Sequence, residues 1–138
     1  MTVSVAEDWI AIRELTARYN RALDDSRADD WVDTFLESGG LYVAGTDDRW
    51  VGKTALMTFV SSKPWGSMHL TVDPEIQVDG DIARQVCSLI MVRRSPNRTA
   101  PVLMTTGRYD DVLSRTLQGW RFDKRVVFLD ASITSPGN

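Results

Sequence analysis

The C-terminal half of the sequence limits the possible fold more than any other feature. Four long β-rich stretches follow one another there, separated by short segments rich in Gly, Asp, Pro, Asn and Ser. In the first of these segments, Asp79-Gly80-Asp81, an Asp-Gly pair lies between two alternating apolar runs, which is a strong hairpin signal. The pattern predicts a four-strand antiparallel meander. Its strands are expected over residues 68–78, 82–93, 101–114 and 120–133.

The N-terminal part of the chain is predicted to be helical. Apolar side chains recur near the helical period over residues 6–24, which indicates one long amphipathic helix. Ser4 can cap the start of this helix, and Glu7 follows three residues later, as in a capping box. The expected buried face consists of Ile10, Leu15, Tyr19 and Leu23.

Shorter elements are expected between this helix and the meander. A second helix is predicted over residues 31–36, capped by Asp29-Asp30 and ended by Gly39-Gly40. A third helix should end near residue 62. Helices that precede an antiparallel sheet define an α+β fold, and long twisted strands tend to curl, which can leave a cavity beside the helices. Two short strands are expected over residues 41–44 and 50–51.

Composition argues against several functional classes. The 138 residues include 16 basic and 19 acidic side chains, and the net charge of −3 argues against nucleic-acid binding. One His and one Cys give no zinc-ligand spacing, and the apolar neighbours of Cys87 predict a buried, inert thiol. The chain shows no linker, signal-peptide pattern or membrane span. We therefore expect one domain over residues 1–138, in the cytoplasm, without a membrane partner.

A series of short motifs runs along the chain. They are Arg-Tyr-Asn-Arg-Ala-Leu-Asp at 18–24, Asp30-Trp31, Gly52-Lys53, His69-Leu70, Pro74, Val78-Asp79-Gly80-Asp81, Gly107-Arg108-Tyr109-Asp110-Asp111, Gly119-Trp120-Arg121-Phe122 and Arg125-Val126-Val127. In this order and spacing they resemble the SnoaL-like family of the NTF2-like superfamily, over nearly the whole chain.

The resemblance implies a fold and a range of functions. The implied fold is an α+β, NTF2-like cone-shaped barrel with three N-terminal helices packed on a curved antiparallel sheet, often as a homodimer or higher homo-oligomer. The superfamily includes scytalone dehydratase, bile-acid 7α-dehydratase and ketosteroid isomerase. The implied function is a lyase or isomerase of the dehydratase type, without a cofactor, acting on a small apolar carbonyl or hydroxyl compound. A non-catalytic ligand-binding or structural subunit, like the dioxygenase β subunits, and a polyketide cyclase or hydrolase remain alternatives.

His69, the sole histidine, is the first candidate for proton transfer, because its ordinary pKa lies near neutral pH. The sequence alone favours a different interpretation, a histidine hydrogen-bonded at a sheet edge. The resemblance implies that it pairs with Asp24, at the end of the first helix, and that Tyr19 assists as a hydrogen-bond donor. On a regular helix Tyr19 and Asp24 differ by roughly 140°, so they do not share one stripe. Asp25 is a competing carboxylate.

At several positions the sequence lacks catalytic residues of its relatives, which narrows the range of reactions expected for this protein. Residues 41–45 contain no carboxylate where ketosteroid isomerases place their base, and residues 84–87 lack the Arg-x-Asp step of the epoxide hydrolases. Arg108 and Asp110 have that step on another strand, and alternation places both on one face. We interpret them as an outward ion pair, and we predict that Arg125 forms a surface salt bridge rather than reaching the pocket.

Large or soft side chains are the candidates for a pocket wall. They favour a flat apolar ligand, such as an aromatic or polycyclic ketone, although many of them are expected simply to fill the core. The predicted substrate-binding residues are Trp31, Phe35, Tyr42, Trp50, Phe59, Trp65, Met68, Met91, Met104 and Phe128.

Overall fold

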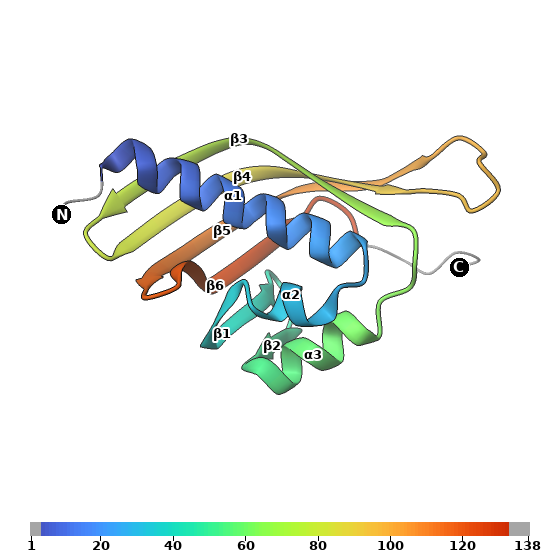
Figure 1. Cartoon of the computed structure of the whole chain (residues 1–138). Helices are drawn as coiled ribbons and strands as arrows, with labels where there is room; N and C mark the ends of the chain where they lie inside the picture. Colours follow the sequence, from blue (N-terminus) through green and yellow to red (C-terminus); the bar gives the residue numbers. More distant parts are fainter. Residues whose placement is uncertain (1–3, 133–138) are drawn as a thin grey trace.

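The computed structural model describes residues 4–132 and shows one long helix lying across a curved sheet. Helix α1 crosses one face of the sheet, while α2 and α3 lie beside β1 and β2 at one end of it (Figure 1). No helix of the described residues is long and apolar enough to cross a membrane. The helices are α1 (Val5–Asp24), α2 (Ala28–Val32) and α3 (Lys53–Ser61). The strands are β1 (Phe35–Val43), β2 (Arg49–Val51), β3 (Ser67–Asp79), β4 (Ile82–Arg93), β5 (Val102–Thr116) and β6 (Gly119–Leu129).

The predicted meander is confirmed, but the sheet is mixed rather than antiparallel. Its six strands have the order β2-β1-β6-β5-β4-β3, and β1 runs parallel to β6. The prediction was wrong here because β1 pairs with the last strand of the meander, to which it is not a sequence neighbour. The β3–β4 turn forms at the predicted Asp-Gly, where Gly80 has φ 61°. The sheet curves without closing, since β2 and β3 are both edges. The predicted last strand ended at residue 133, which lies outside the described residues.

The region after α1 differs most from the prediction. Residues predicted to end the second helix, Phe35 and Leu36, instead begin β1, and Gly39-Gly40 lies inside that strand rather than ending a helix. A Cβ on Gly39 would lie 2.6 Å from the carbonyl oxygen of Phe122, so glycine permits the close approach of β1 to β6. The predicted Asp cap of α2 is also wrong, because its N-cap is Arg27, without a capping side chain.

Helix α1 begins with the predicted capping box. The Glu7 backbone N–H donates to Ser4 Oγ at 3.2 Å, and the Ser4 N–H donates to Glu7 Oε2 at 2.9 Å. One residue of the predicted apolar face is wrong: Ile10 is 58% exposed, and Ile12 is buried in its place. Ile12, Leu15, Tyr19 and Leu23 recur every three or four residues, as the buried stripe of a helix requires.

A chain of buried hydrogen bonds fastens α1 to the middle of the sheet. Gln85 of β4 donates to Thr16 of α1 at 3.0 Å and to Asp111 of β5 at 2.9 Å. Arg125 of β6 donates to Asp111 through Nε at 2.9 Å, and both side chains are fully buried. The prediction of a surface position for Arg125 is therefore wrong. A register shift between β5 and β6 follows Phe122 and reverses the alternation, which turns Arg125 inward.

Strand β3 bends midway along its length. The β3–β4 register shifts between Val72 and Glu75, and Asp73 in this bulge has φ 53°. Bulges bend a strand and increase its local twist, and Pro74 is tolerated here because a bulge need not supply a ladder hydrogen bond. In Figure 1, β3 arches alongside α1, and its last residues pass behind the first turns of the helix. The first residues of β3 lie against the C-terminal end of α1, where the backbone N–H of His69 donates to Asp24.

Candidate active site

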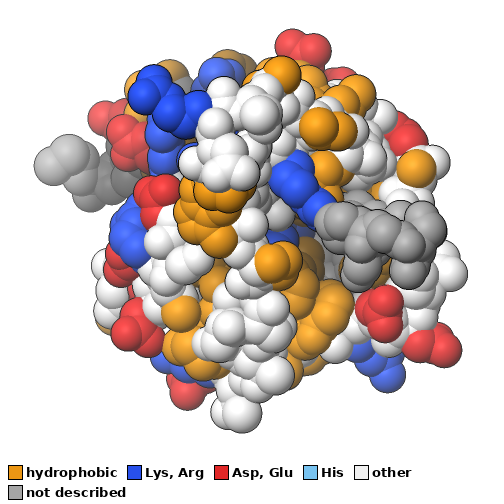
Figure 2. All heavy atoms as spheres, turned by 90° about the vertical axis from the view of Figure 1, so that its right-hand side faces the viewer, with side chains coloured by type: hydrophobic (Ala, Val, Ile, Leu, Met, Phe, Trp, Pro, Cys, Tyr) orange, Lys and Arg blue, Asp and Glu red, His pale blue; other side chains and the backbone are white. Residues whose placement is uncertain are grey.

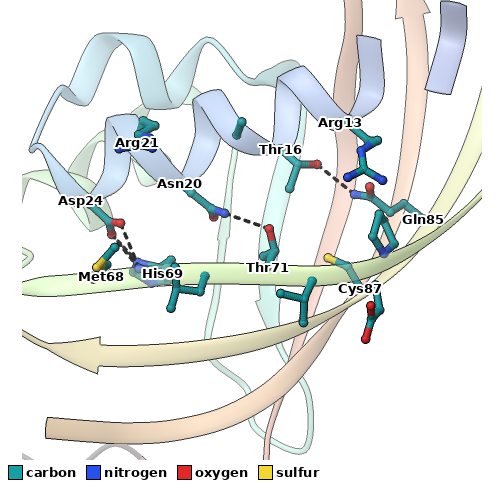
Figure 3. Close-up of a pocket in the computed structure, with 15 residues that line it drawn as sticks. Arg13, Thr16, Asn20, Arg21, Asp24, Met68, His69, Thr71, Gln85 and Cys87 are labelled. Carbon is teal, nitrogen blue, oxygen red and sulfur yellow. Dashed lines mark hydrogen bonds and ion pairs between the residues drawn. The ribbon is translucent and has the colours of Figure 1, made fainter. Parts of the chain in front are cut away.

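Asp24 and His69 form a hydrogen-bonded pair where the end of α1 meets the start of β3. Asp24 Oδ1 lies 2.6 Å from His69 Nδ1 (Figure 3). The backbone N–H of His69 also donates to this carboxylate, at 2.9 Å to Oδ2. One turn earlier on α1, Asn20 Nδ2 donates to Thr71 Oγ1 at 3.0 Å. Two links between one helix and one strand therefore fix the relative position of the pair.

The environment of His69 favours its neutral form. Only 3% of the His69 side chain and 12% of the Asp24 side chain are exposed. Burial lowers the pKa of His69 below its ordinary value, and the positive charges of Lys63 and Arg125 lower it further, although the hydrogen bond to Asp24 opposes the shift. A carboxylate can only accept from the ring, so Nδ1 carries the proton. Nε2 is then left as a hydrogen-bond acceptor, the state that a general base requires.

His69 borders two hollows. The first is a groove of about 520 Å³ between α1 and β3, which Asp24, Asn20 and Gln85 also line. The second, called the interior cavity below, is a half-open hollow of about 340 Å³ between the helices and the concave face of the sheet, lined mainly by apolar and aromatic side chains. His69 thus lies between a groove of mixed polarity and a largely apolar cavity. Figure 2 shows one end of the molecule, where hydrophobic side chains gather and no histidine is visible.

The two assisting candidates lie on different sides of His69. Tyr19 is fully buried and lines the interior cavity, whereas Asp24 lines the groove. Their angular separation on α1 fits this division, and His69 lines both hollows. Burial raises the pKa of Tyr19, so its hydroxyl keeps its proton and remains a donor. Asp25, the competing carboxylate, is the exposed C-cap of α1.

The predicted wall residues divide among several environments. Trp50, Phe59 and Met91 line the interior cavity, and Met68 lines the groove. Trp31 and Phe35 are buried in the aromatic core against Tyr19. The remaining candidates line neither hollow. They are Trp65, which is 59% exposed, Tyr42 beneath Lys124, Phe128 beneath Arg108, and Met104.

Other features of the two hollows were not predicted. Tyr109 and Lys63 line the interior cavity, and Lys63 follows α3 in a segment whose sequence carries no catalytic motif. Strand alternation could have supplied Leu89, because it shares a face with Met91. Cys87 is buried as predicted and lines the groove, and burial raises the pKa of its thiol to about 11.

Two further observations concern polar groups away from the pair. Arg108 Nε lies 3.4 Å from Asp110 Oδ1, and both side chains are about half exposed, so the predicted outward ion pair is confirmed. Within residues 4–132, no three His, Cys, Asp or Glu side chains come together as a group that could hold a metal ion.

The curved open sheet, with a helix across its concave face and a cavity beneath that helix, defines an NTF2-like α+β protein. The chain belongs to the SnoaL-like family, since the model of the SnoaL-like domain matches residues 4–126. No curated protein matches the sequence.

Solved structures share this fold. An NTF2-like protein with a cystatin-like fold from Novosphingobium aromaticivorans is 25% identical, with a TM-score of 0.82 over 93% of this chain and 86% of that one. A candidate scytalone dehydratase from the same organism is 16% identical, with a TM-score of 0.78 over 93% and 88%. The β subunit of a candidate aromatic-ring-hydroxylating dioxygenase, again from that organism, is 20% identical, with a TM-score of 0.80 over 96% and 95%. The last two likenesses concern the fold alone.

Proposed function

We propose that this protein is a lyase or isomerase of the dehydratase type that needs no cofactor and uses Asp24 and His69 for acid–base chemistry. The observation that carries the proposal is the 2.6 Å contact between a partly buried carboxylate and the sole imidazole, at the border of an apolar cavity. Perturbed titratable groups at a cavity are a recurrent feature of active sites. A candidate scytalone dehydratase with the same fold is consistent with this class of reaction.

The interior cavity suggests the size and polarity of the substrate. Its volume of about 340 Å³ is near the lower end of ligand pockets, which span roughly 300–1,000 Å³. Trp50, Phe59, Leu89 and Met91 supply an apolar wall, which suits an aromatic or alicyclic ring. Few polar groups face this cavity, and His69, Tyr19 and Tyr109 are among them. A small apolar carbonyl or hydroxyl compound, with its polar atom toward His69, fits this description.

Each residue of the site has a distinct role in the proposed reaction. His69 Nε2 accepts a proton from the carbon next to a carbonyl. Asp24 holds the ring through Nδ1 and stabilises the imidazolium once the proton has been transferred. Tyr19 donates a hydrogen bond to a substrate oxygen from inside the cavity. A positioned acid–base group of this kind contributes about 10²–10⁴-fold to the rate.

The principal alternative is a subunit that binds or supports a partner without catalysis, since a dioxygenase β subunit has the same fold. That function gives no reason for a histidine to border a cavity. A buried imidazole that served only the core would be expected to pack away from any hollow, yet His69 lines two. The position of His69 therefore favours the catalytic proposal.

Exchange of a substrate hydrogen for deuterium tests the proposal before the natural substrate is known. 2-Tetralone, a bicyclic aromatic ketone, and a panel of related ketones would be incubated with the protein in deuterium oxide. Mass spectrometry would then follow deuterium incorporation next to the carbonyl. We expect exchange faster than in buffer with the wild-type protein, and a decrease of at least about 100-fold with Asp24→Asn.

The outward ion pair supplies the matched control. Asp110→Asn makes the same chemical change at a half-exposed carboxylate that also contacts a basic side chain. It should leave the exchange rate unchanged. Full exchange activity in Asp24→Asn, or exchange no faster than in buffer for every ketone of the panel, would contradict the proposal.

A further inference from the structure

Lys63 brings a positive charge to the same cavity as His69. It follows α3 directly, and its backbone N–H donates to the Val60 carbonyl at 3.4 Å. Its side chain is half-buried and lines the interior cavity, with Nζ 5.4 Å from the centre of the Phe59 ring. The cavity therefore contains a neutral base and a lysine against a largely apolar wall.

The charge of Lys63 is poorly compensated by the protein. No carboxylate of residues 4–132 lies within ion-pair distance of its ammonium group. Burial lowers the pKa of Lys63, and the more distant charge of Asp24 opposes this shift. Placing an unpaired ammonium group beside an apolar cavity costs folding free energy. Residues that carry such a cost are commonly retained for function.

Lys63 is also close enough to the pair to influence it electrostatically. Its positive charge is one cause of the lowered pKa of His69. A cation that lines the same cavity disfavours the imidazolium, which keeps His69 ready to accept a proton. The same cation would stabilise negative charge that develops on a substrate as its proton leaves, because the low polarity of the cavity strengthens the interaction.

We propose that Lys63 is a further catalytic residue, whose ammonium group binds the carbonyl oxygen of the substrate and stabilises the enolate that forms when His69 removes the neighbouring proton. This inference rests on the proposed function and specifies its substrate as a carbonyl compound. The electron pair of the broken C–H bond forms a carbon–carbon double bond, and the carbonyl π electrons move to the oxygen. In a dehydration, the enolate re-forms the carbonyl and expels a β-hydroxyl group, which takes the proton from His69 and leaves as water.

A phenol of low pKa tests the inference without turnover, because its phenolate resembles an enolate. We would titrate the protein with 4-nitrophenol below the phenol's own pKa and follow the visible absorption of the phenolate. The wild-type protein should bind it in the ionised form. Lys63→Met should weaken this binding about 10- to 100-fold, the usual effect of losing a hydrogen bond between charged groups. Lys63→Arg keeps the charge and should retain most of the affinity.

Two controls separate this inference from the proposed function. Lys124→Met removes an exposed lysine that also lies over an aromatic ring, 4.7 Å from the centre of Tyr42, and should not change phenolate binding. His69→Ala should lose deuterium exchange, and in the His69→Ala background Lys63→Met should still weaken phenolate binding. If His69→Ala keeps full exchange, the proposed function fails, whatever the phenolate result.

Three results would overturn the role of Lys63. The first is equal affinity of the wild-type protein and Lys63→Met for the phenolate, with both proteins folded by circular dichroism. The second is failure of the wild-type protein to bind 4-nitrophenol in its ionised form. The third is a covalent adduct of 2-tetralone on Lys63, trapped with borohydride and located by mass spectrometry, because it would identify the amine as a nucleophile that forms an imine and releases water.

Discussion

Two carboxylates of this protein, one 12% exposed and the other fully buried, each contact a basic side chain, but the two pairs differ in what they can do. Asp24 contacts His69 at 2.6 Å on the border of two hollows, and Asp111 contacts Arg125 at 2.9 Å in the fully buried core. Imidazole can gain and lose a proton near neutral pH, whereas guanidinium remains protonated. The first pair therefore suits proton transfer, and the second suits structural support.

The neighbours of the two pairs reinforce this contrast. The ring centres of Tyr19 and Tyr109 lie 4.3 and 3.6 Å from the Arg125 guanidinium carbon. Gln85 donates to Asp111, so this network includes side chains from α1, β4, β5 and β6. The pair of Asp24 and His69 joins only α1 and β3. The difference teaches that buried ion pairing alone does not identify an active site, and that access to a cavity and a titratable partner are also required.

The largest expected effect is on activity at the first pair. His69→Ala should reduce deuterium exchange about 10²–10⁴-fold, because the only candidate base is removed. Its stability should fall less than that of Asp111→Ala, since Asp24 still accepts a hydrogen bond from the backbone N–H of residue 69. Exchange rates measured beside calorimetric unfolding would check both statements. A large loss of stability together with retained activity would reverse the contrast between the two pairs.

The next largest effect is on stability at the second pair. Asp111→Ala should lower the free energy of unfolding by about 3–5 kcal/mol, because it leaves the buried Arg125 charge without its carboxylate. Chemical denaturation followed by tryptophan fluorescence would measure this. A loss below about 1 kcal/mol would mean that the network of Gln85 and Arg125 does not hold the core together.

The pH dependence of activity should report the first pair. His69 must be neutral to accept a proton, and burial lowers its pKa below the ordinary value of 6.5. The rate at low substrate concentration should therefore rise as pH increases through this lowered pKa, with a midpoint below pH 6.5. Asp24 opposes the lowering, so the residual activity of Asp24→Asn should begin to rise at a still lower pH. A midpoint above 6.5 in the wild-type protein would contradict the predicted burial of a neutral ring.

The smallest effect on stability is expected at the exposed ion pair. Comparing it with the buried pair shows what burial contributes to stability. Arg108 and Asp110 are on β5, where Asp110 directly precedes Asp111 of the buried network. Both side chains face outward and are about half exposed. Asp110→Asn should change the free energy of unfolding by less than about 1 kcal/mol, as exposed ion pairs usually do. Denaturation under the same conditions as Asp111→Ala would measure the difference. Equal losses in the two variants would show that burial is not the deciding factor.

The main features of the fold could be predicted from local sequence patterns. The capping box, the β3–β4 turn and the four long strands all depend on residues that are close in the sequence. The parallel pairing of β1 with β6 could not be predicted in this way, because it joins residues far apart along the chain. The role of Gly39 was misinterpreted for the same reason. Gly39 lies against Phe122, on a strand that follows about eighty positions later in the sequence.

The candidate site was less accessible to prediction from the residues. The spacing of residues in the sequence did not predict which side chains surround His69. The family resemblance suggested Asp24 as its partner. Arg125 was misplaced because the bulge after Phe122 changes which face of β6 each side chain occupies, and no local signal marked that bulge. Lys63 was missed because a lysine after a helix is ordinarily exposed, and only the tertiary structure brings it to the cavity.

Nitrogen NMR of the imidazole tests the central claim most directly, since the chain contains one histidine and its signals need no assignment among several. A pH titration of the labelled protein would give both the tautomer and the pKa of His69. We expect a neutral ring protonated at Nδ1, a pKa below 6.5, and a change at Nε2 when 2-tetralone binds. A ring protonated at Nε2, or one with an ordinary pKa and no response to any apolar ketone, would contradict the account.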